Sequence, residues 1–197
     1  MGLKITKEEI ARLPIEQFEG CIVVIENEKS ATKAINRLLE CDVIGFDTET
    51  KPVFRRGQHN KVALMQLATE NECFLFRLNK MGYLRSLDNI ICNPGIKKIG
   101  LSLSDDFAAI RNREYNHKPA NFVDLQSFVD KYGIEDNSLQ KIYAILFGKK
   151  ITKNQRLTNW EAKKLSDAQK AYAALDAWAC LKIYTFLCNS TNYNETV

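Results

Sequence analysis

The chain has 197 residues, of which 45% are hydrophobic and 26% are charged, a balance typical of one globular domain. No apolar run approaches the roughly 18 residues of a membrane-spanning helix, so no membrane partner is expected. The formal net charge of +4 permits a polyanionic partner without requiring one.

The first half of the chain predicts a leader followed by neighbouring strands. Residues 1–19 predict a leader with a short helix that starts after Thr6 and stops at Pro14. A strand and a helix come next, at 21–27 and 29–41. Three strand-like runs follow at 43–49, 61–69 and 72–78, and the polar link Glu70-Asn71 between the last two predicts a hairpin.

Helices and strands alternate in the second half. Helices are predicted at 83–91, 105–114, 126–133 and 137–148, and strands at 97–103 and 122–126. A long last helix is predicted at 167–188, followed by a polar, flexible tail at 189–197. This order is typical of an α/β fold in which helices flank a mixed β-sheet on both faces.

Two carboxylates end the strand in "VIGFDTET" (43–50). Asp47 and Glu49 share one face of that strand, because side chains two residues apart point the same way. Their repulsion is about 3 kcal/mol at an effective dielectric constant of about 20. Other acid-x-acid pairs lie at polar strand boundaries, whereas this pair directly continues an apolar run, at a strand end where α/β sheets usually bind ligands. A solvated strand end is the alternative.

The last helix carries a second candidate site. Ser166 and Gln169 form a capping-box pattern at its start. Tyr172 and Asp176 are four residues apart and share one helix face with several apolar side chains. An unpaired charge in an apolar stripe is costly, so Asp176 requires a counter-charge, a metal ion or a proton. The alternative is a position at the edge of the stripe, from which the carboxylate reaches solvent.

Three further acids have strong structural interpretations. Asp105 and Asp106 fall in the first turn of a predicted helix, where the helix dipole favours acids. Adjacent helical residues point about 100° apart, so at most one of them faces a shared site. Asp124 lies in a predicted strand, and we expect it to cap the next helix or bond the backbone.

The acids, together with the scarcity of histidines and paired cysteines, favour a site for hard divalent cations. Converging carboxylates need cations, and Mg²⁺ and Mn²⁺ prefer carboxylate oxygens. Two such ions about 4 Å apart can promote an in-line displacement at phosphorus. The six cysteines form no CxxC pair and only two histidines occur, so we expect reduced, buried thiols and no structural zinc site. No export signal is visible, which predicts a cytoplasmic or nucleoid-associated protein.

The motifs "VIGFDTET", "KKIGLSLSDDFAAI" and "YAALD" occur in this order, with "KVALMQLAT", "NFVDLQ" and "LTNW" between them. In these residues the chain resembles the DEDD 3′–5′ exonucleases, especially the ribonuclease D and Werner-syndrome-type domains. The resemblance covers about residues 20–188 and implies one exonuclease domain with a ribonuclease H-like fold.

The resemblance also implies a site and a reaction. The metal-binding carboxylates would be Asp47, Glu49, Asp106 and Asp176, with Asp106 preferred to Asp105 by the frame of the motif. Tyr172 implies the tyrosine-bearing DEDDy subclass, in which the hydroxyl helps to position the attacking water. Two divalent cations, Mg²⁺ or Mn²⁺, would support hydrolysis of the 3′-terminal phosphodiester of DNA or RNA. The products would be nucleoside 5′-monophosphates, and the role would lie in DNA repair or RNA processing.

Two basic stretches are candidates for nucleic-acid contacts, through Arg55 and Arg56 after the first motif and Lys153 and Arg156 before the third. Ordinary solvated loops are the alternative. Trp160 is expected to pack against the last helix, with stacking on a nucleic-acid base as the alternative. The Werner-type enzymes carry a tryptophan where this chain has Phe107-Ala108-Ala109.

Two other functions remain open, namely a catalytically silent nucleic-acid-binding module and a ribonuclease H-like endonuclease.

Overall fold

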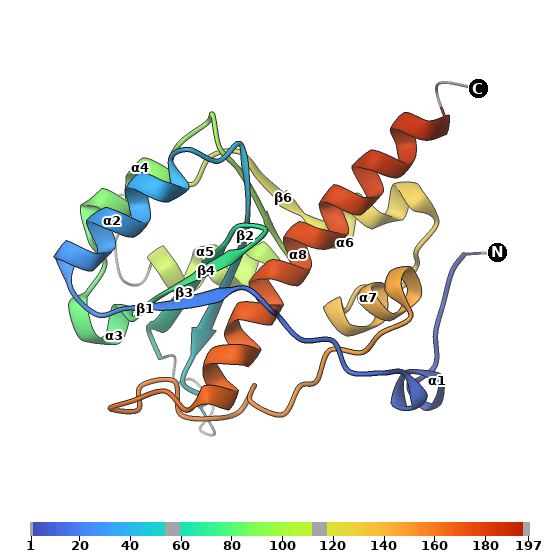
Figure 1. Cartoon of the computed structure of the whole chain (residues 1–197), viewed down its shortest axis with the longest axis horizontal. Helices are drawn as coiled ribbons and strands as arrows, with labels where there is room; N and C mark the ends of the chain where they lie inside the picture. The colour runs from blue at the N-terminus through green and yellow to red at the C-terminus, as the bar shows by residue number, and fades with distance from the viewer. Residues whose placement is uncertain (1, 54–59, 112–117, 195–197) are drawn as a thin grey trace.

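The computed structural model describes residues 2–53, 60–111 and 118–194, with side chains described as far as Ser190. Its centre is a six-stranded sheet (Figure 1). The strands lie in the order β1 (Cys21–Ile25), β4 (Glu72–Phe76), β3 (Val62–Ala68), β2 (Val43–Thr50), β5 (Lys97–Gly100) and β6 (Phe122–Asp124).

The sheet is mixed, as the sequence predicts. β3 pairs antiparallel with both β2 and β4, whereas the β1–β4, β2–β5 and β5–β6 pairs are parallel. The hairpin predicted around Glu70-Asn71 is confirmed by the β3–β4 pair. β3 is buried along its whole length, because strands and helices cover it on every side.

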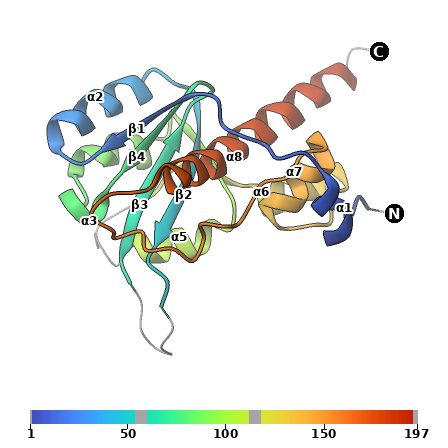
Figure 2. The same ribbon diagram turned by 60° about the horizontal axis from the view of Figure 1, so that its bottom comes forward.

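Helices cover both faces of the sheet (Figure 2), which confirms the predicted α/β architecture. One face packs against the elements α2 (Glu28–Leu38), α3 (Leu78–Met81), η1 (Arg85–Leu87), α4 (Asp88–Ile91) and α5 (Leu103–Arg111). The other face packs mainly against α6 (Leu125–Val129), α7 (Leu139–Phe147) and α8 (Asp167–Asn194), with η2 (Asp130–Tyr132) after α6.

α8 lies directly against β2 and β3. Gly45 makes this close approach possible, because a Cβ atom there would lie 2.0 Å from the carbonyl oxygen of Ala177. The predicted capping box is present, since the amides of Ser166 and Gln169 each bond the other residue's side chain, at 3.0 and 3.1 Å. The close packing fixes the first turns of α8 against the end of β2.

Residues before β1 pack against the rest of the chain. α1 (Lys7–Arg12) begins with a capping box between Thr6 and Glu9. Backbone bridges join Leu3 to Ile134 and Ile15 to Lys150. Through these two bridges, the predicted leader contacts the chain both before and after α7.

Several predicted boundaries are wrong. The last helix was expected to end at residue 188 and continues to Asn194, and the predicted helix at 105–114 begins at Leu103. The expectation of buried thiols is correct for Cys73 and Cys180 only, because Cys21 is exposed and the other three cysteines are partly exposed. Among the described residues, no helix combines the length and apolar character that crossing a membrane requires.

Candidate active site

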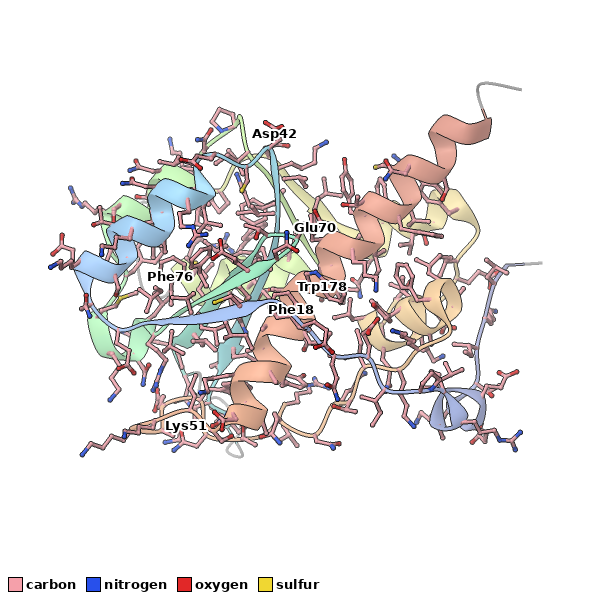
Figure 3. The ribbon with its side chains drawn as sticks, viewed as in Figure 1. Phe18, Asp42, Lys51, Glu70, Phe76 and Trp178 are labelled. Carbon is pink, nitrogen blue, oxygen red and sulfur yellow. The ribbon has the colours of Figure 1, made fainter. Side chains whose placement is uncertain are left out.

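Three of the predicted carboxylates converge at one end of the sheet. Asp47 and Glu49 come from the end of β2, and Asp176 comes from the third turn of α8. One carboxylate oxygen of each residue lies within 4.8 Å of the others. Lys51, just after β2, marks this end of the sheet below the start of α8, whereas Asp42 marks the opposite end (Figure 3). Segments far apart in the sequence therefore build one acidic site.

Asp106 approaches the same site from α5. Its carboxylate accepts a hydrogen bond from the hydroxyl of Thr48, which lies between the two β2 acids. Its charge also raises the pKa values of Asp47 and Glu49. Asp105 is exposed to solvent, so the geometry favours Asp106 as the acid of this motif.

Asp124 holds the start of α5 in place. Its carboxylate accepts hydrogen bonds from the backbone amides of Ser102 and Leu103, at 3.1 and 2.9 Å, and from Gln126, at 2.9 Å. Ser102 has a φ of 60°, a left-handed conformation that non-glycine residues rarely adopt. The expected structural role of Asp124 is confirmed, and its effect is to orient the helix that carries Asp106.

Tyr172 connects the carboxylates to an apolar cluster. Its hydroxyl donates a hydrogen bond to Asp176, as the predicted shared helix face requires. Its ring packs beside the buried indole of Trp160, with ring centroids 6.0 Å apart. Trp160 therefore packs against α8, as predicted, and fixes the position of the tyrosine ring.

Burial raises the pKa of each of the four carboxyl groups. Asp47 has a pKa well above its ordinary value, to which the charges of Asp106, Glu49 and Asp176 also contribute. Burial, assisted by Asp176 and Asp106, raises the pKa of Glu49 to about 9. The pKa is raised to about 6 for Asp106 and to about 7 for Asp176. A bound cation would oppose these shifts by stabilising the ionised forms.

A cavity of about 580 Å³ opens beside Glu49 and Asp106. Arg156 lines it, and its charge lowers the pKa of Glu49, while the charge of Lys153 lowers the pKa of Asp176. Two of the four predicted basic residues are thus placed beside the acids. Arg55 and Arg56 lie outside the described residues.

Arg77 anchors the segment that carries Lys153, Arg156 and Trp160. This arginine is almost fully buried after β4, and its guanidinium donates to the backbone carbonyl of Ala162. It also pairs with Glu26 at 3.1 Å. The segment between α7 and α8 is thereby held beside the acidic site.

Comparison with known proteins shows which family the chain belongs to. A family model described as 3′–5′ exonuclease matches residues 22–192. The chain belongs to the 3′–5′ exonuclease family. A curated relative, the bifunctional 3′–5′ exonuclease/ATP-dependent helicase WRN of Mus musculus, is 33% identical over 188 residues. That match covers 90% of this chain, which spans only 13% of the relative's length.

Solved structures share the fold of this chain. The Nibbler EXO domain of Aedes aegypti has a TM-score of 0.74 at 21% identity and covers 94% of this chain and 89% of that domain. Ribonuclease D of Escherichia coli has a TM-score of 0.76 at 23% identity, over 86% of this chain and 45% of that protein. These matches confirm the predicted ribonuclease H-like fold.

The acidic site of this exonuclease-family chain fits hard divalent cations. Its donors are all carboxylate oxygens, which Mg²⁺ and Mn²⁺ prefer. Three of them already lie within 4.8 Å of one another, so one ion can contact all three without rearrangement of the backbone. The raised pKa values show that the cluster lacks sufficient compensating charge of its own.

Sequence reasoning missed two residues beside the acids. Thr48 received no role, although its hydroxyl bonds Asp106. Gln66 was treated as part of an apolar strand, although it pairs directly with Asp47 across β2 and β3. The only signal for Gln66 in the sequence is one amide in the otherwise apolar run "VALMQLA".

Proposed function

We propose that this chain is a metal-dependent 3′–5′ exonuclease that hydrolyses nucleic acid from a free 3′ end and releases nucleoside 5′-monophosphates. The observation that carries the proposal is the convergence of Asp47, Glu49 and Asp176, with Tyr172 hydrogen-bonded to the last of them. Family membership supports degradation from the 3′ end towards the 5′ end, and the carboxylates support a site for two cations.

The carboxylates would divide between two ions. Asp47, Glu49 and Asp176 would hold one ion. Asp47 would hold the other, and Asp106 would act chiefly through water molecules around that second ion. When bound, such ions lower the pKa of water and neutralise charge on the leaving oxygen. The protein contributes by keeping its four acids fixed on β2, α5 and α8, so little reorganisation accompanies the reaction.

Tyr172 is suited to orient the attacking water. Burial, together with the charges of Asp176 and Glu49, raises its pKa above the ordinary value, so the hydroxyl keeps its proton. A protonated hydroxyl can both donate and accept hydrogen bonds. Held by Asp176 on one side and Trp160 on the other, it can fix a water molecule next to the carboxylates.

Lys153 and Arg156 would bind phosphates of the substrate. This role is supported by their electrostatic effect on Asp176 and Glu49, beside which the scissile phosphate of a bound 3′ end would lie. Contacts to phosphates are independent of base sequence and weaken with salt. DNA and RNA are both compatible with such contacts.

Degradation assays with matched DNA and RNA test this function. Single-stranded and 3′-recessed substrates labelled at the 5′ end should shorten progressively with Mg²⁺ or Mn²⁺. Asp47→Ala and Asp176→Ala should lower kcat by at least about 10³-fold, because each removes a carboxylate that holds an ion. Asp106→Ala should also lose activity, whereas the matched control Asp105→Ala should retain it.

Two outcomes would replace the proposal with another function. Cleavage of a circular substrate would indicate an endonuclease. Folded protein that binds nucleic acid but degrades none of these substrates with either ion would indicate a silent binding module. Mass spectrometry of the products distinguishes nucleoside 5′-monophosphates from other ends.

A further inference from the structure

Gln66 is a buried polar side chain whose amide has no hydrogen-bond partner among the described residues. It lies in the middle of β3 and is 0% exposed. Neither its amide nitrogen nor its amide oxygen has a hydrogen-bond partner among the residues that the structure describes. A buried amide without partners destabilises a fold by about 1–3 kcal/mol, and an apolar side chain of similar shape avoids that cost.

The register of the sheet places Gln66 beside Asp47. The two residues are direct partners in the antiparallel β2–β3 pair, so their side chains lie on the same face of the sheet. Directly opposed residues have Cβ atoms about 4.5–5.5 Å apart, which is within reach of a glutamine amide and an aspartate carboxylate. This face is the one that α8 covers, because Gly45 on it meets Ala177.

The other neighbours of Gln66 on this face offer it no partner. Leu64 and Ala68 flank it along β3, and Leu75 is its direct partner on β4. All three belong to the apolar cluster beneath α8. The carboxylate of Asp47 is therefore the polar group that the strand pairing brings next to the amide.

We propose that Gln66 is a positioning residue for Asp47, whose carboxylate accepts a hydrogen bond from Nε2 of Gln66 when Asp47 holds divalent cations. This inference rests on the proposed function. An ionised carboxylate only accepts hydrogen bonds, so the NH₂ end of the amide must face it. Such a bond leaves Asp47 one orientation toward the ions. Outer partners of this kind change metal affinity by about 10–100-fold.

Trp160 carries a donor that is complementary to the other end of the amide. Its indole Nε1 is buried and also lacks a partner among the described residues, and its ring belongs to the same apolar cluster. An indole only donates, and the oxygen of a glutamine amide only accepts. A bond from Trp160 to Oε1 of Gln66 would satisfy both groups and leave Nε2 free for Asp47.

Gln66→Met separates positioning from packing. Methionine has a similar shape and volume and removes the buried amide. Without ions, the thermal midpoint of the variant should equal or exceed that of the wild type, because no amide is left without partners. Its affinity for Mn²⁺, measured by calorimetry, should fall 10–100-fold. At subsaturating Mn²⁺ its activity should fall, and added Mn²⁺ should restore much of it.

Leu67→Met is the matched control. Leu67 is the next residue of β3 and packs on the opposite face of the sheet. The affinity of the Leu67→Met variant for Mn²⁺ should therefore stay within about twofold of the wild-type affinity. Gln66→Leu serves as a second variant if the methionine variant fails to fold. Wild-type affinity in both folded Gln66 variants would overturn the inference while leaving the proposed function intact. Absence of Mn²⁺ binding by the wild type would overturn both.

Discussion

Among the described residues, Tyr172 and Tyr143 are buried tyrosines whose hydroxyls bond a carboxylate. Tyr172 bonds Asp176 beside the acidic cluster, whereas Tyr143, on α7, bonds Glu16 of the segment before β1, at 2.5 Å. Burial raises the pKa of both phenols. The two residues differ in their surroundings. Tyr143 accepts a hydrogen bond from Lys182, and its partner Glu16 pairs with Lys149, whereas Tyr172 faces carboxylates that are suited to hold cations.

Tyr172→Phe should therefore lower kcat by about 100-fold and change KM for the nucleic acid little, because the hydroxyl that orients the attacking water is lost. Its affinity for Mn²⁺ should stay near that of the wild type, since no carboxylate is removed. Tyr143→Phe is the matched control and should destabilise the fold while leaving kcat unchanged. Equal kcat values for Tyr172→Phe and wild type in steady-state assays would rule out the proposed role of this hydroxyl.

An ionic cluster around Glu16 joins the segment before β1 to α7 and α8. Glu16 is only 6% exposed, accepts hydrogen bonds from Lys149 and Lys182 at 3.0 and 3.1 Å, and also bonds Tyr143. Although burial opposes it, the hydrogen bonds from Tyr143, Lys149 and Lys182 lower the pKa of Glu16 to about 2. The cluster thus joins an N-terminal segment to α7 and α8.

Glu16→Gln should lower the free energy of unfolding by about 2–3 kcal/mol near neutral pH. The folded pKa is about 2 and the ordinary value is 4.5, so this stabilisation is present above about pH 4.5 and is lost as the pH falls towards about 2. Urea titrations of both proteins across this range measure the difference. Glu19→Gln, at an exposed position of the same segment, should have no comparable effect, and a constant difference from neutral to acid pH would contradict the mechanism.

The sequence predicted elements whose signal is local. The hairpin at Glu70-Asn71 and the capping box at Ser166 both depend on a few adjacent residues, and both are present. The last helix continues past residue 188 because polarity alone does not end a helix. Gln66 escaped notice because its position opposite Asp47 depends on the register of two strands, which no local pattern specifies.

The same distinction applies to the candidate site. Asp47, Glu49 and Asp176 were found because each breaks an apolar pattern, and Asp106 was preferred to Asp105 by the frame of its motif. The bond between Thr48 and Asp106 joins β2 to α5 across 58 positions, so it could not be read from either segment. The contact of Asp124 with the start of α5 is likewise long-range, although its structural character was predicted.

For the molecule as a whole, the acidic site opposes folding when no cation is present. In an unfolded chain the four carboxyl groups have ordinary pKa values near 4. In the folded protein burial raises the pKa values of Glu49, Asp176 and Asp106 to about 9, 7 and 6, and repulsion by other acids contributes at Glu49 and Asp106. The folded state therefore binds more protons than the unfolded state between about pH 4 and about pH 9. Stability must fall as pH rises through this window.

The ion-free protein should accordingly be less stable at about pH 8.5 than at about pH 6, and Mg²⁺ should stabilise it more at the higher pH. At the lower pH an ion must displace protons that the cluster retains, whereas at the higher pH more carboxylates are already ionised. Thermal unfolding with chelator and with Mg²⁺, at both pH values, measures the two effects. Asp176→Asn removes one charge and one ligand, so it should flatten the pH dependence and reduce the stabilisation by Mg²⁺. Equal stabilisation by Mg²⁺ at both pH values in the wild type would show that ions and protons do not compete for these carboxylates.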